Sequence, residues 1–283
     1  MSRFPSSIAL VALISSACFI GSNSVTAGEN WRNRASAEEA GVTQSDIAAE
    51  ITFGRAIAAR ILGRYPIYDN PKLIKYINLL GVTLAQNTNR PELEFHLMIL
   101  NTDEINAYAA PGGYVFITKG ALAQMKDESE LAGVLGHEIA HIAEKHIVRD
   151  LKIKGSDESG TNDLARLIGG SSESARAAFG QAVDKGLELI VKDDYKKEDE
   201  MQADKTGITI SAFSGYDPAG LARYLTRIKP LKEKTPAANT ENTHPTFDSR
   251  TAQINEIINK EALINAAQTK NSKRFAENLK ALQ

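Results

Sequence analysis

Five consecutive residues of this chain have the types and the spacing of a metal-dependent hydrolytic site. They are His137-Glu138-Ile139-Ala140-His141, the pattern His-Glu-x-x-His. On an α-helix, residues four apart lie on one face, so His137 and His141 can direct both imidazoles at one ion. Glu138 lies beside them, near enough to accept a proton from a water molecule on that ion. The five residues therefore predict a zinc-dependent peptidase.

The segment around this pattern is predicted to be a helix. Asp127 or Ser129 can cap its start. Four apolar residues then recur at helical spacing: Leu131, Leu135, Ile139 and Ile142. This apolar stripe lies next to the histidine face, so the site would rest on a buried helix.

A catalytic zinc ion needs a third protein ligand and one position for water. Acidic residues are abundant after the two histidines. Spacing alone does not choose among Glu188, Glu198, Glu200 and Asp204. The residues themselves therefore leave the third ligand open.

The region before the central helix is predicted to contain two helices and then a strand. Helical spacing of apolar residues indicates a helix over 45–62. A second helix should begin at Pro71, with Asn70 as its cap. Residues 93–100 alternate between apolar and polar side chains, which predicts a strand with His96 on its solvated side.

Two short extended pieces are predicted over 106–118, joined by the turn Pro111-Gly112-Gly113. Residues 155–174 are rich in Gly, Ser, Asp and Glu, and they form either a mobile lid or an exposed connector. Further helices are expected over 175–191, through 203–210, and over 218–283 with a break around 230–245. The order of elements predicts an α+β fold, mainly helical, with a small sheet beside the central helix.

Length and composition exclude several classes of protein. The chain has 283 residues with 42% hydrophobic content, so it can bury a substantial core and is not a disordered protein. A formal net charge of -2 gives no electrostatic reason to expect nucleic acid, or a membrane bound through a polybasic surface.

The first 27 residues have the features of a secretory signal peptide. Arg3 supplies positive charge, residues 8–20 are mostly apolar, and Val25-Thr26-Ala27 forms a small-residue cleavage site. A membrane anchor is the alternative, but the apolar stretch is shorter than about 20 residues. Ser15-Ser16-Ala17 before Cys18 also resembles a bacterial lipoprotein signal, in which Cys18 would be lipidated and associate with a membrane. We expect a periplasmic or secreted protein, or an outer-membrane lipoprotein facing the periplasm.

Three ordered motifs resemble those of the Ste24-type zinc metallopeptidases, relatives of the CAAX prenyl protease. Glu200-Met201-Gln202-Ala203-Asp204 matches their Glu-x-x-Ala-Asp motif, which follows His-Glu-x-x-His on a later helix. The segment from His244 to Arg250 matches their His-Pro-x-x-x-x-Arg element, and residues 106–114 resemble the segment that they place along the cleft. The resemblance implies a gluzincin-like metallopeptidase fold.

The resemblance implies a role for each matching residue. It makes Glu200 the third ligand of one zinc ion, while Asp204 would orient a ligand histidine through its second ring nitrogen. His244 and Arg250 would line the cleft opposite Glu138, where the developing oxyanion needs positive donors. Alternatively, His244 would occupy the fourth zinc position at rest and silence the enzyme until substrate displaces it.

The resemblance also implies a place for substrate. An exposed strand edge would pair with an extended substrate backbone, and the residues concerned are Asn106, Ala107, Tyr108, Gly112 and Gly113. The alternative is that this strand lies in the interior of the sheet. His146 matches no motif and is expected to be an exposed helix residue. We expect residues 28–283 to form one metallopeptidase domain, with N-terminal helices, a catalytic region over about 70–253 and a helical C-terminal tail.

Three functions are compatible with these features. The first is a zinc metalloendopeptidase that hydrolyses misfolded or unassembled cell-envelope proteins. The second is a chaperone-like protein that binds such clients through a largely autoinhibited zinc site. The third is a structural metal-binding domain without a client.

Overall fold

The fold is given by a computed structural model that describes residues 42–155, 172–192, 195–232, 245–265 and 268–282. The predicted signal peptide with Cys18, nearly all of the connector over 155–174, and His244 lie outside the described residues. What the sequence predicts for them stays a prediction.

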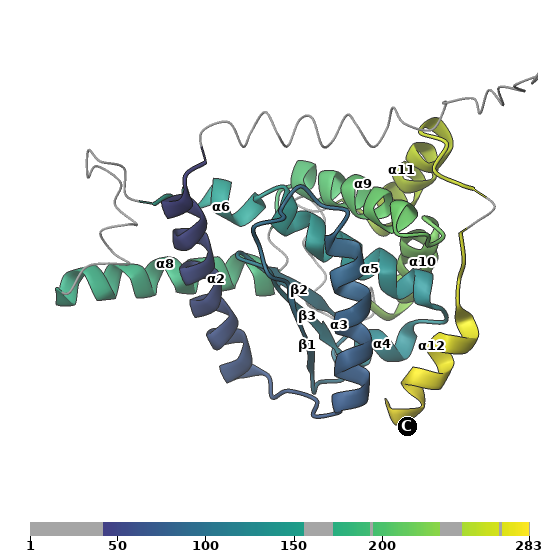
Figure 1. The fold of residues 1–283 in the computed structure, drawn as a ribbon, viewed down its shortest axis with the longest axis horizontal. Helices are drawn as coiled ribbons and strands as arrows, with labels where there is room; N and C mark the ends of the chain where they lie inside the picture. The colour runs from purple at the N-terminus through teal and green to yellow at the C-terminus, as the bar shows by residue number, and fades with distance from the viewer. Residues whose placement is uncertain (1–41, 156–171, 193–194, 233–244, 266–267, 283) are drawn as a thin grey trace, which may run out of the picture.

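The described part of the chain is mostly helical (Figure 1). Its elements, in order, are helices α2 (Gln44–Arg64) and α3 (Pro71–Ala85), strands β1 (His96–Leu100), β2 (Ala107–Ala110) and β3 (Tyr114–Thr118), helices α4 (Lys119–Gln124), α5 (Glu128–Ala143), α6 (His146–Asp150), α8 (Glu173–Val191), α9 (Lys197–Phe213), α10 (Gly220–Lys232), α11 (Phe247–Lys260) and α12 (Ser272–Leu279), and the 3-10 helix η2 (Lys280–Leu282). Among these described helices, none combines the length and the hydropathy needed to cross a bilayer.

The three strands form one mixed sheet in the order β1-β3-β2. Strand β1 runs parallel to β3 and β2 runs antiparallel to it, so that Phe116 of β3 lies between Met98 and Tyr108. In the turn between β2 and β3, Gly112 and Gly113 have φ angles of 75° and 97°. Glycine adopts this left-handed region without strain. The predicted hairpin is therefore confirmed, together with the need for glycine at its turn.

Other predicted elements agree with the structure except at their ends and in the C-terminal tail, where the helix predicted after the break around 230–245 is divided into α11 and α12. The Asn70 side chain accepts the amide of Leu73 at 3.1 Å, so α3 begins at the predicted cap. The strand predicted to start at Leu93 starts instead at His96, because the Leu93 amide turns back to the Arg90 carbonyl. His96 is exposed, as predicted.

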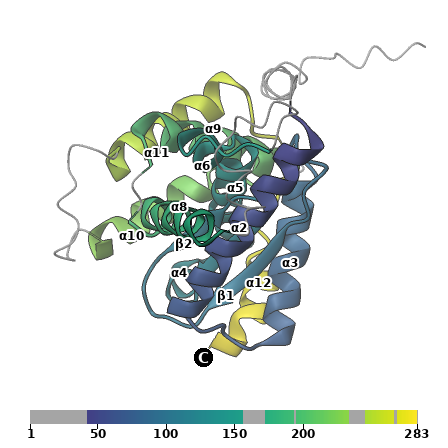
Figure 2. The ribbon, with the colours of Figure 1, turned by 90° about the vertical axis from the view of Figure 1, so that its left-hand side faces the viewer.

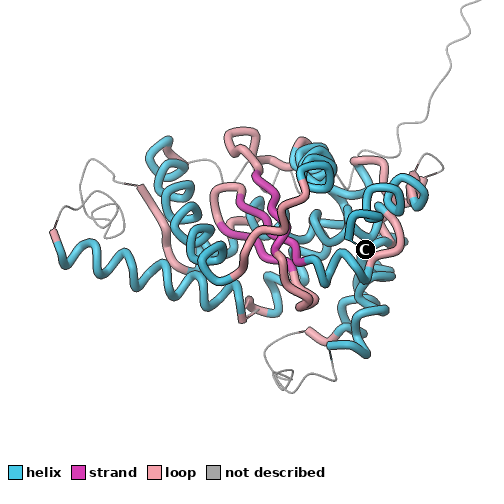
Figure 3. The backbone as a smooth tube through the Cα atoms, turned by 90° about the horizontal axis from the view of Figure 1, so that it is seen from below, coloured by secondary structure: helices cyan, strands magenta, loops and turns pink. Residues whose placement is uncertain are grey.

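Both faces of the sheet are covered by hydrophobic side chains. On β3, Val115 and Ile117 belong to the core formed with α3 and α5, whereas Phe116 belongs to the core formed with α2 and α8. Figure 2 looks at the molecule from the side of α2 and α8, and Figure 3 shows the strands enclosed among the helices. This alternation explains why a sheet of three short strands is stable inside a mainly helical domain.

Helix α5 is the central element of the fold. All sixteen of its residues are buried, which is more than the predicted apolar stripe. It packs against β2 and against helices α3, α9 and α10. The predicted fold class is confirmed: the protein is α+β and mainly helical, with a small sheet beside the helix that carries His-Glu-x-x-His.

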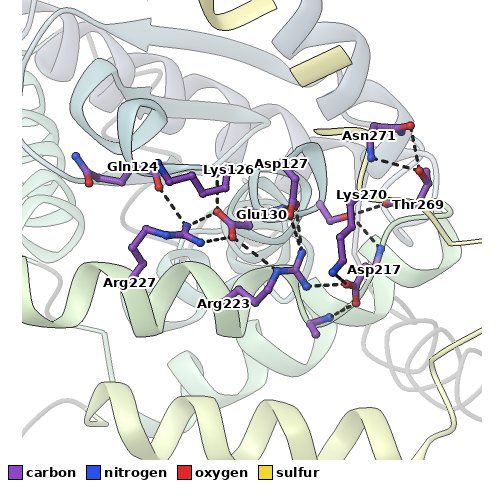
Figure 4. Close-up of polar contacts among 12 residues, drawn as sticks. Gln124, Lys126, Asp127, Glu130, Asp217, Arg223, Arg227, Thr269, Lys270 and Asn271 are labelled. Atoms are coloured by element: carbon purple, nitrogen blue, oxygen red, sulfur yellow. Dashed lines mark hydrogen bonds and ion pairs between the residues drawn. The ribbon is translucent and has the colours of Figure 1, made fainter. Parts of the chain in front are cut away.

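Charged side chains hold the N-terminal end of α5 (Figure 4). Asp127 caps the helix by accepting the amide of Glu130 at 2.9 Å. Arg223 of α10 donates to Asp127 at 3.1 and 3.2 Å and to Asp217 at 2.6 Å. One turn later, Arg227 donates to Glu130 at 2.5 and 2.7 Å. Asp127 and Glu130 are buried, and buried carboxylates need such partners, so these contacts fix where α5 enters the core.

Candidate metal centre

Helices α5 and α9 touch through two glycines. A Cβ atom added at Gly207 would lie 2.6 Å from the backbone nitrogen of His137 and 2.8 Å from the carbonyl carbon of Gly136. One added at Gly136 would lie 2.7 Å from the carbonyl oxygen of Gly207. Two backbones approach this closely only where neither carries a side chain. The contact brings the first turns of α9, which carry Glu200, to the histidine face of α5.

Three side chains from these helices converge on one point. The Nε2 atoms of His137 and His141 lie 3.1 Å apart. The two carboxylate oxygens of Glu200 lie 3.3 Å from Nε2 of His141 and 3.7 Å from Nε2 of His137. Among the residues that the structure describes, no other group of three His, Cys, Asp or Glu side chains brings its ligand atoms within 4.8 Å of one another.

The four acidic candidates for a third ligand occupy different places. Glu200 is buried in this cluster, and Asp204 lies one helical turn later against the outer nitrogen of His137. Glu188 on α8 and Glu198 on α9 are exposed. The structure thus brings His137, His141 and Glu200 together and leaves Glu188 and Glu198 apart from them.

The geometry and charge of the cluster fit a metal ion. Two nitrogens bound to a tetrahedral zinc ion lie about 3.3 Å apart, close to the histidine separation here. Burial alone would raise the pKa of Glu200, but Arg250, His137 and His141 outweigh it and hold this pKa well below 4.5. Glu200 is therefore a carboxylate, and two imidazoles with one carboxylate form a donor set used by catalytic zinc sites.

Asp204 and Arg250 support the first histidine and the carboxylate. Oδ1 of Asp204 lies 2.9 Å from Nδ1 of His137. Arg250 donates two hydrogen bonds to Asp204, at 2.6 and 2.8 Å, and its Nη1 lies 3.1 Å from Glu200. Burial would raise the pKa of Asp204, but Arg250 and His137 lower it on balance. A carboxylate on Nδ1 places that proton on the outer nitrogen of His137 and leaves Nε2 available to a metal.

Among the histidines that the structure describes, His146 is the one whose predicted place is wrong. It is 1% exposed, and its Nδ1 lies 2.8 Å from Nδ1 of His141. After α5 ends, Lys145 has a left-handed backbone with φ of 56°, which turns α6 back toward α5. Burial, with smaller effects of His141 and Arg149, lowers the pKa of His146 to about 2, so its ring is neutral. Tyr195 stacks on His141, with ring centroids 4.1 Å apart.

Nothing in the spacing of the sequence indicates the contact between His146 and His141. At helical spacing, His146 would lie about 140° around the axis from His141, on a different face. Only the turn at Lys145, a residue type that rarely adopts positive φ, brings the two rings together. The contact could not be predicted from periodicity.

The remaining predicted residues lie on α5 and around β2. Glu138 is on α5 next to His137 and is 9% exposed. Asn106 and Ala107 are half-buried, and Tyr108, Gly112 and Gly113 are buried. A small cavity beside the edge of β2 is lined by Ala109, Pro111, His141, Lys145 and Tyr195, among others. Ala109 of β2 and the second histidine of the cluster therefore line the same cavity, where the Tyr195 hydroxyl donates to the Ala109 carbonyl at 3.5 Å.

The α5–α9 contact gives a first prediction. Gly207→Ala should separate the two helices, lower the free energy of unfolding by about 1–3 kcal/mol, and weaken metal binding. Urea unfolding of the metal-free protein and titration with zinc measure the two effects. The matched control is Gly63→Ala in α2, where an added Cβ meets nothing within 4 Å; it should leave metal binding unchanged. Wild-type affinity in Gly207→Ala would show that the glycine contact does not position Glu200.

Comparison with known proteins agrees with this geometry. The sequence profile described as "Peptidase family M48" matches residues 71–258, which include all three converging side chains. The Beta-barrel assembly-enhancing protease of Escherichia coli (strain K12) is 28% identical over 225 residues, which cover 78% of this chain and 46% of the relative. This chain thus spans about half the length of that relative.

Two further relatives carry names of the same kind. The Metalloprotease LoiP of Escherichia coli (strain K12) is 23% identical over 201 residues, 69% of this chain and 74% of the relative. The Mitochondrial metalloendopeptidase OMA1 of Arabidopsis thaliana is 23% identical over 134 residues, 47% of this chain and 26% of the relative. All three names denote proteases, and two of them name a metal-dependent one.

Proposed function

This chain belongs to peptidase family M48, and we propose that it is a zinc-dependent endopeptidase acting on misfolded or unassembled proteins of the cell envelope. The observation that carries the proposal is the convergence of His137, His141 and Glu200 next to Glu138, inside the region that the family profile covers. Metal dependence follows from the family and the donor set. The choice of zinc rests on the chemistry of two imidazoles and one carboxylate.

In this proposal His137, His141 and Glu200 hold one zinc ion. When bound there, zinc would polarise the scissile carbonyl and lower the pKa of a water molecule. Glu138 takes the proton of the attacking water and then returns it to the leaving amine. A carboxylate one residue after the first histidine is near enough to the cluster for this transfer.

Asp204 and Arg250 act as supports. Asp204 keeps Nε2 of His137 directed at the ion, and Arg250 holds both Asp204 and Glu200. Donation from Arg250 to the oxyanion stays a prediction, as do both predicted roles of His244, the resting zinc ligand and the oxyanion donor.

The edge of β2 is proposed to bind an extended substrate. The Thr118 amide donates to the Asn106 carbonyl at 3.0 Å. By the alternation of an antiparallel pair, the N–H and C=O of Ala107 then point away from β3. The Ala107 N–H donates to the Asn106 side chain at 3.0 Å, so a substrate backbone would pair there by displacing that amide oxygen. Such pairing makes no demand for particular substrate side chains, which suits unfolded segments. Substrate contacts of Tyr108, Gly112 and Gly113 stay predictions, because all three are buried.

The place of action is proposed from the signal-like N-terminus and the names of the relatives. One relative is named for enhancing β-barrel assembly. We therefore propose the periplasm, reached either as a soluble protein or as an outer-membrane lipoprotein attached through Cys18. The envelope substrates and the lipid are both part of this proposal.

The proposal is tested by offering the enzyme one substrate protein in two states, unfolded and folded. The zinc-loaded protein is incubated with a urea-unfolded outer-membrane β-barrel protein and with the same protein folded in detergent. We expect fragments from the unfolded form only, lost with a chelator and restored by zinc. Cleavage that persists after complete metal removal would contradict the metallopeptidase assignment. If the protein instead prevents aggregation of the unfolded form without cutting it, the chaperone-like function is favoured.

A further inference from the structure

His141 has an outer partner unlike that of His137. His137 meets a carboxylate, Asp204, whereas His141 meets the imidazole of His146 at 2.8 Å between Nδ1 atoms. His146 lies on α6, is 1% exposed, and belongs to none of the motifs used so far. Two facing Nδ1 atoms at this distance share one proton, so one ring must donate and the other must accept.

The groups beyond His146 decide which ring donates. Nε2 of Gln202 donates to Glu144 at 2.6 Å, which turns the amide oxygen of Gln202 toward His146. That oxygen lies 3.3 Å from Nε2 of His146. An amide oxygen only accepts, so the proton of His146 is on Nε2.

Two further contacts agree with this assignment. Oδ1 of Asp199 lies 3.6 Å from the same Nε2 of His146, and it also lies 3.2 Å from Nη2 of Arg149. Thr206 donates to the second oxygen of Glu144 at 2.6 Å, which holds that carboxylate against Gln202. Acceptors therefore surround Nε2 of His146, and its Nδ1 is left as an acceptor.

We infer that His146 is a positioning residue of the metal centre: it accepts the Nδ1 proton of His141 and so keeps Nε2 of His141 free and aimed at the ion. The inference rests on the proposed metal site. Glu144 and Gln202 orient His146, which orients His141, in one directional chain of hydrogen bonds. The neutral ring fixes the tautomer without adding another negative charge beside Glu138, Glu200 and Asp204.

The competing explanation is that His146 only fills space between α5 and α9. Two substitutions separate the explanations. His146→Asn places Oδ1 close to the position of Nδ1, since both atoms are bonded to Cγ, and so keeps an acceptor for His141. Leu in His146→Leu branches at Cγ like Asn and has a larger volume than Asn, but it offers no acceptor. The Nδ1 proton of His141 would then be unpaired in a buried site. If His146 only packs, zinc affinity should be better preserved in His146→Leu. If His146 positions His141, zinc affinity should be better preserved in His146→Asn.

The measurement is zinc affinity, by competition with a chelating dye, in the wild type and three variants. Loss of an outer partner of a ligand histidine typically weakens metal binding about 10–100-fold. We expect such a loss in His146→Leu and a smaller one in His146→Asn. The control His96→Leu, which changes an exposed histidine on β1, should match the wild type. Thermal unfolding of the metal-free variants reports packing separately.

The outcomes are distinct. If His146→Leu binds zinc as tightly as the wild type, or more tightly than His146→Asn, the inference is wrong. Nitrogen-15 chemical shifts of the histidine rings give a second test that needs no metal: His146 should carry its proton on Nε2, and a proton on Nδ1 overturns the inference. A wild type that binds zinc but cuts no substrate would defeat the proposed peptidase and leave this test valid, whereas one that binds no zinc defeats both.

Discussion

Glu138→Gln should lower kcat about 100- to 10,000-fold, the range for loss of a general base, and leave the zinc content at its wild-type level. Gln has nearly the same shape as Glu, so α5 keeps its packing, but its amide cannot take up the proton of the attacking water. Glu138 does not belong to the converging ligand group, so metal binding has no reason to change. Cleavage of fluorogenic casein and elemental analysis of the same preparation measure the two effects.

The matched control is Glu188→Gln. Glu188 lies exposed on α8, where it contacts Lys192, so the same chemical change is made away from the cluster. This variant should cleave at the wild-type rate. If Glu138→Gln also cleaves at that rate, another group takes the proton, and the assignment of Glu138 fails.

The features predicted correctly from the sequence are the local ones. His137 and His141 are brought together by the periodicity of one helix. Asp127 caps that helix by accepting the backbone amide of the residue three positions later. The hairpin at Gly112 and Gly113 is equally local, because the required φ angles belong to the turn itself. In each case the interacting groups are a few residues apart, so spacing is enough to place them.

The position of the proposed third ligand depends on contacts between distant segments. Glu200 reaches the histidines because Gly136 and Gly207 let two helices touch, and nothing in the spacing of acidic residues shows this. The motif resemblance, rather than the spacing, singled it out. His146 had neither kind of signal, and its burial follows from a left-handed residue, Lys145, that the sequence does not mark. Long-range packing thus explains the limit at Glu200, and a local backbone conformation that the sequence does not mark explains the limit at His146.

Glu200→Gln should abolish stoichiometric zinc binding. The dissociation constant for zinc should rise by more than about 100-fold, the upper end of the range for loss of a group that hydrogen-bonds a metal ligand. Two effects act in the same direction. The substitution removes the anionic ligand, and it leaves the positive charge of Arg250, 3.1 Å from that carboxylate, less compensated beside the ion. Arg250 keeps its two hydrogen bonds to Asp204, so the fold around α9 should survive. Chelator competition and elemental analysis measure the loss.

Glu198→Gln is the control for this prediction, because Glu198 lies on the same helix two residues earlier and is exposed. It should bind zinc like the wild type. Zinc retained by Glu200→Gln but lost from Glu198→Gln would mean that α9 presents a different face to α5. The graded order also matters: affinity should fall most in Glu200→Gln, less in His146→Leu and not at all in Glu198→Gln. Only a ligand, a residue that orients a ligand and a residue outside the site produce that order, so the series distinguishes the three roles.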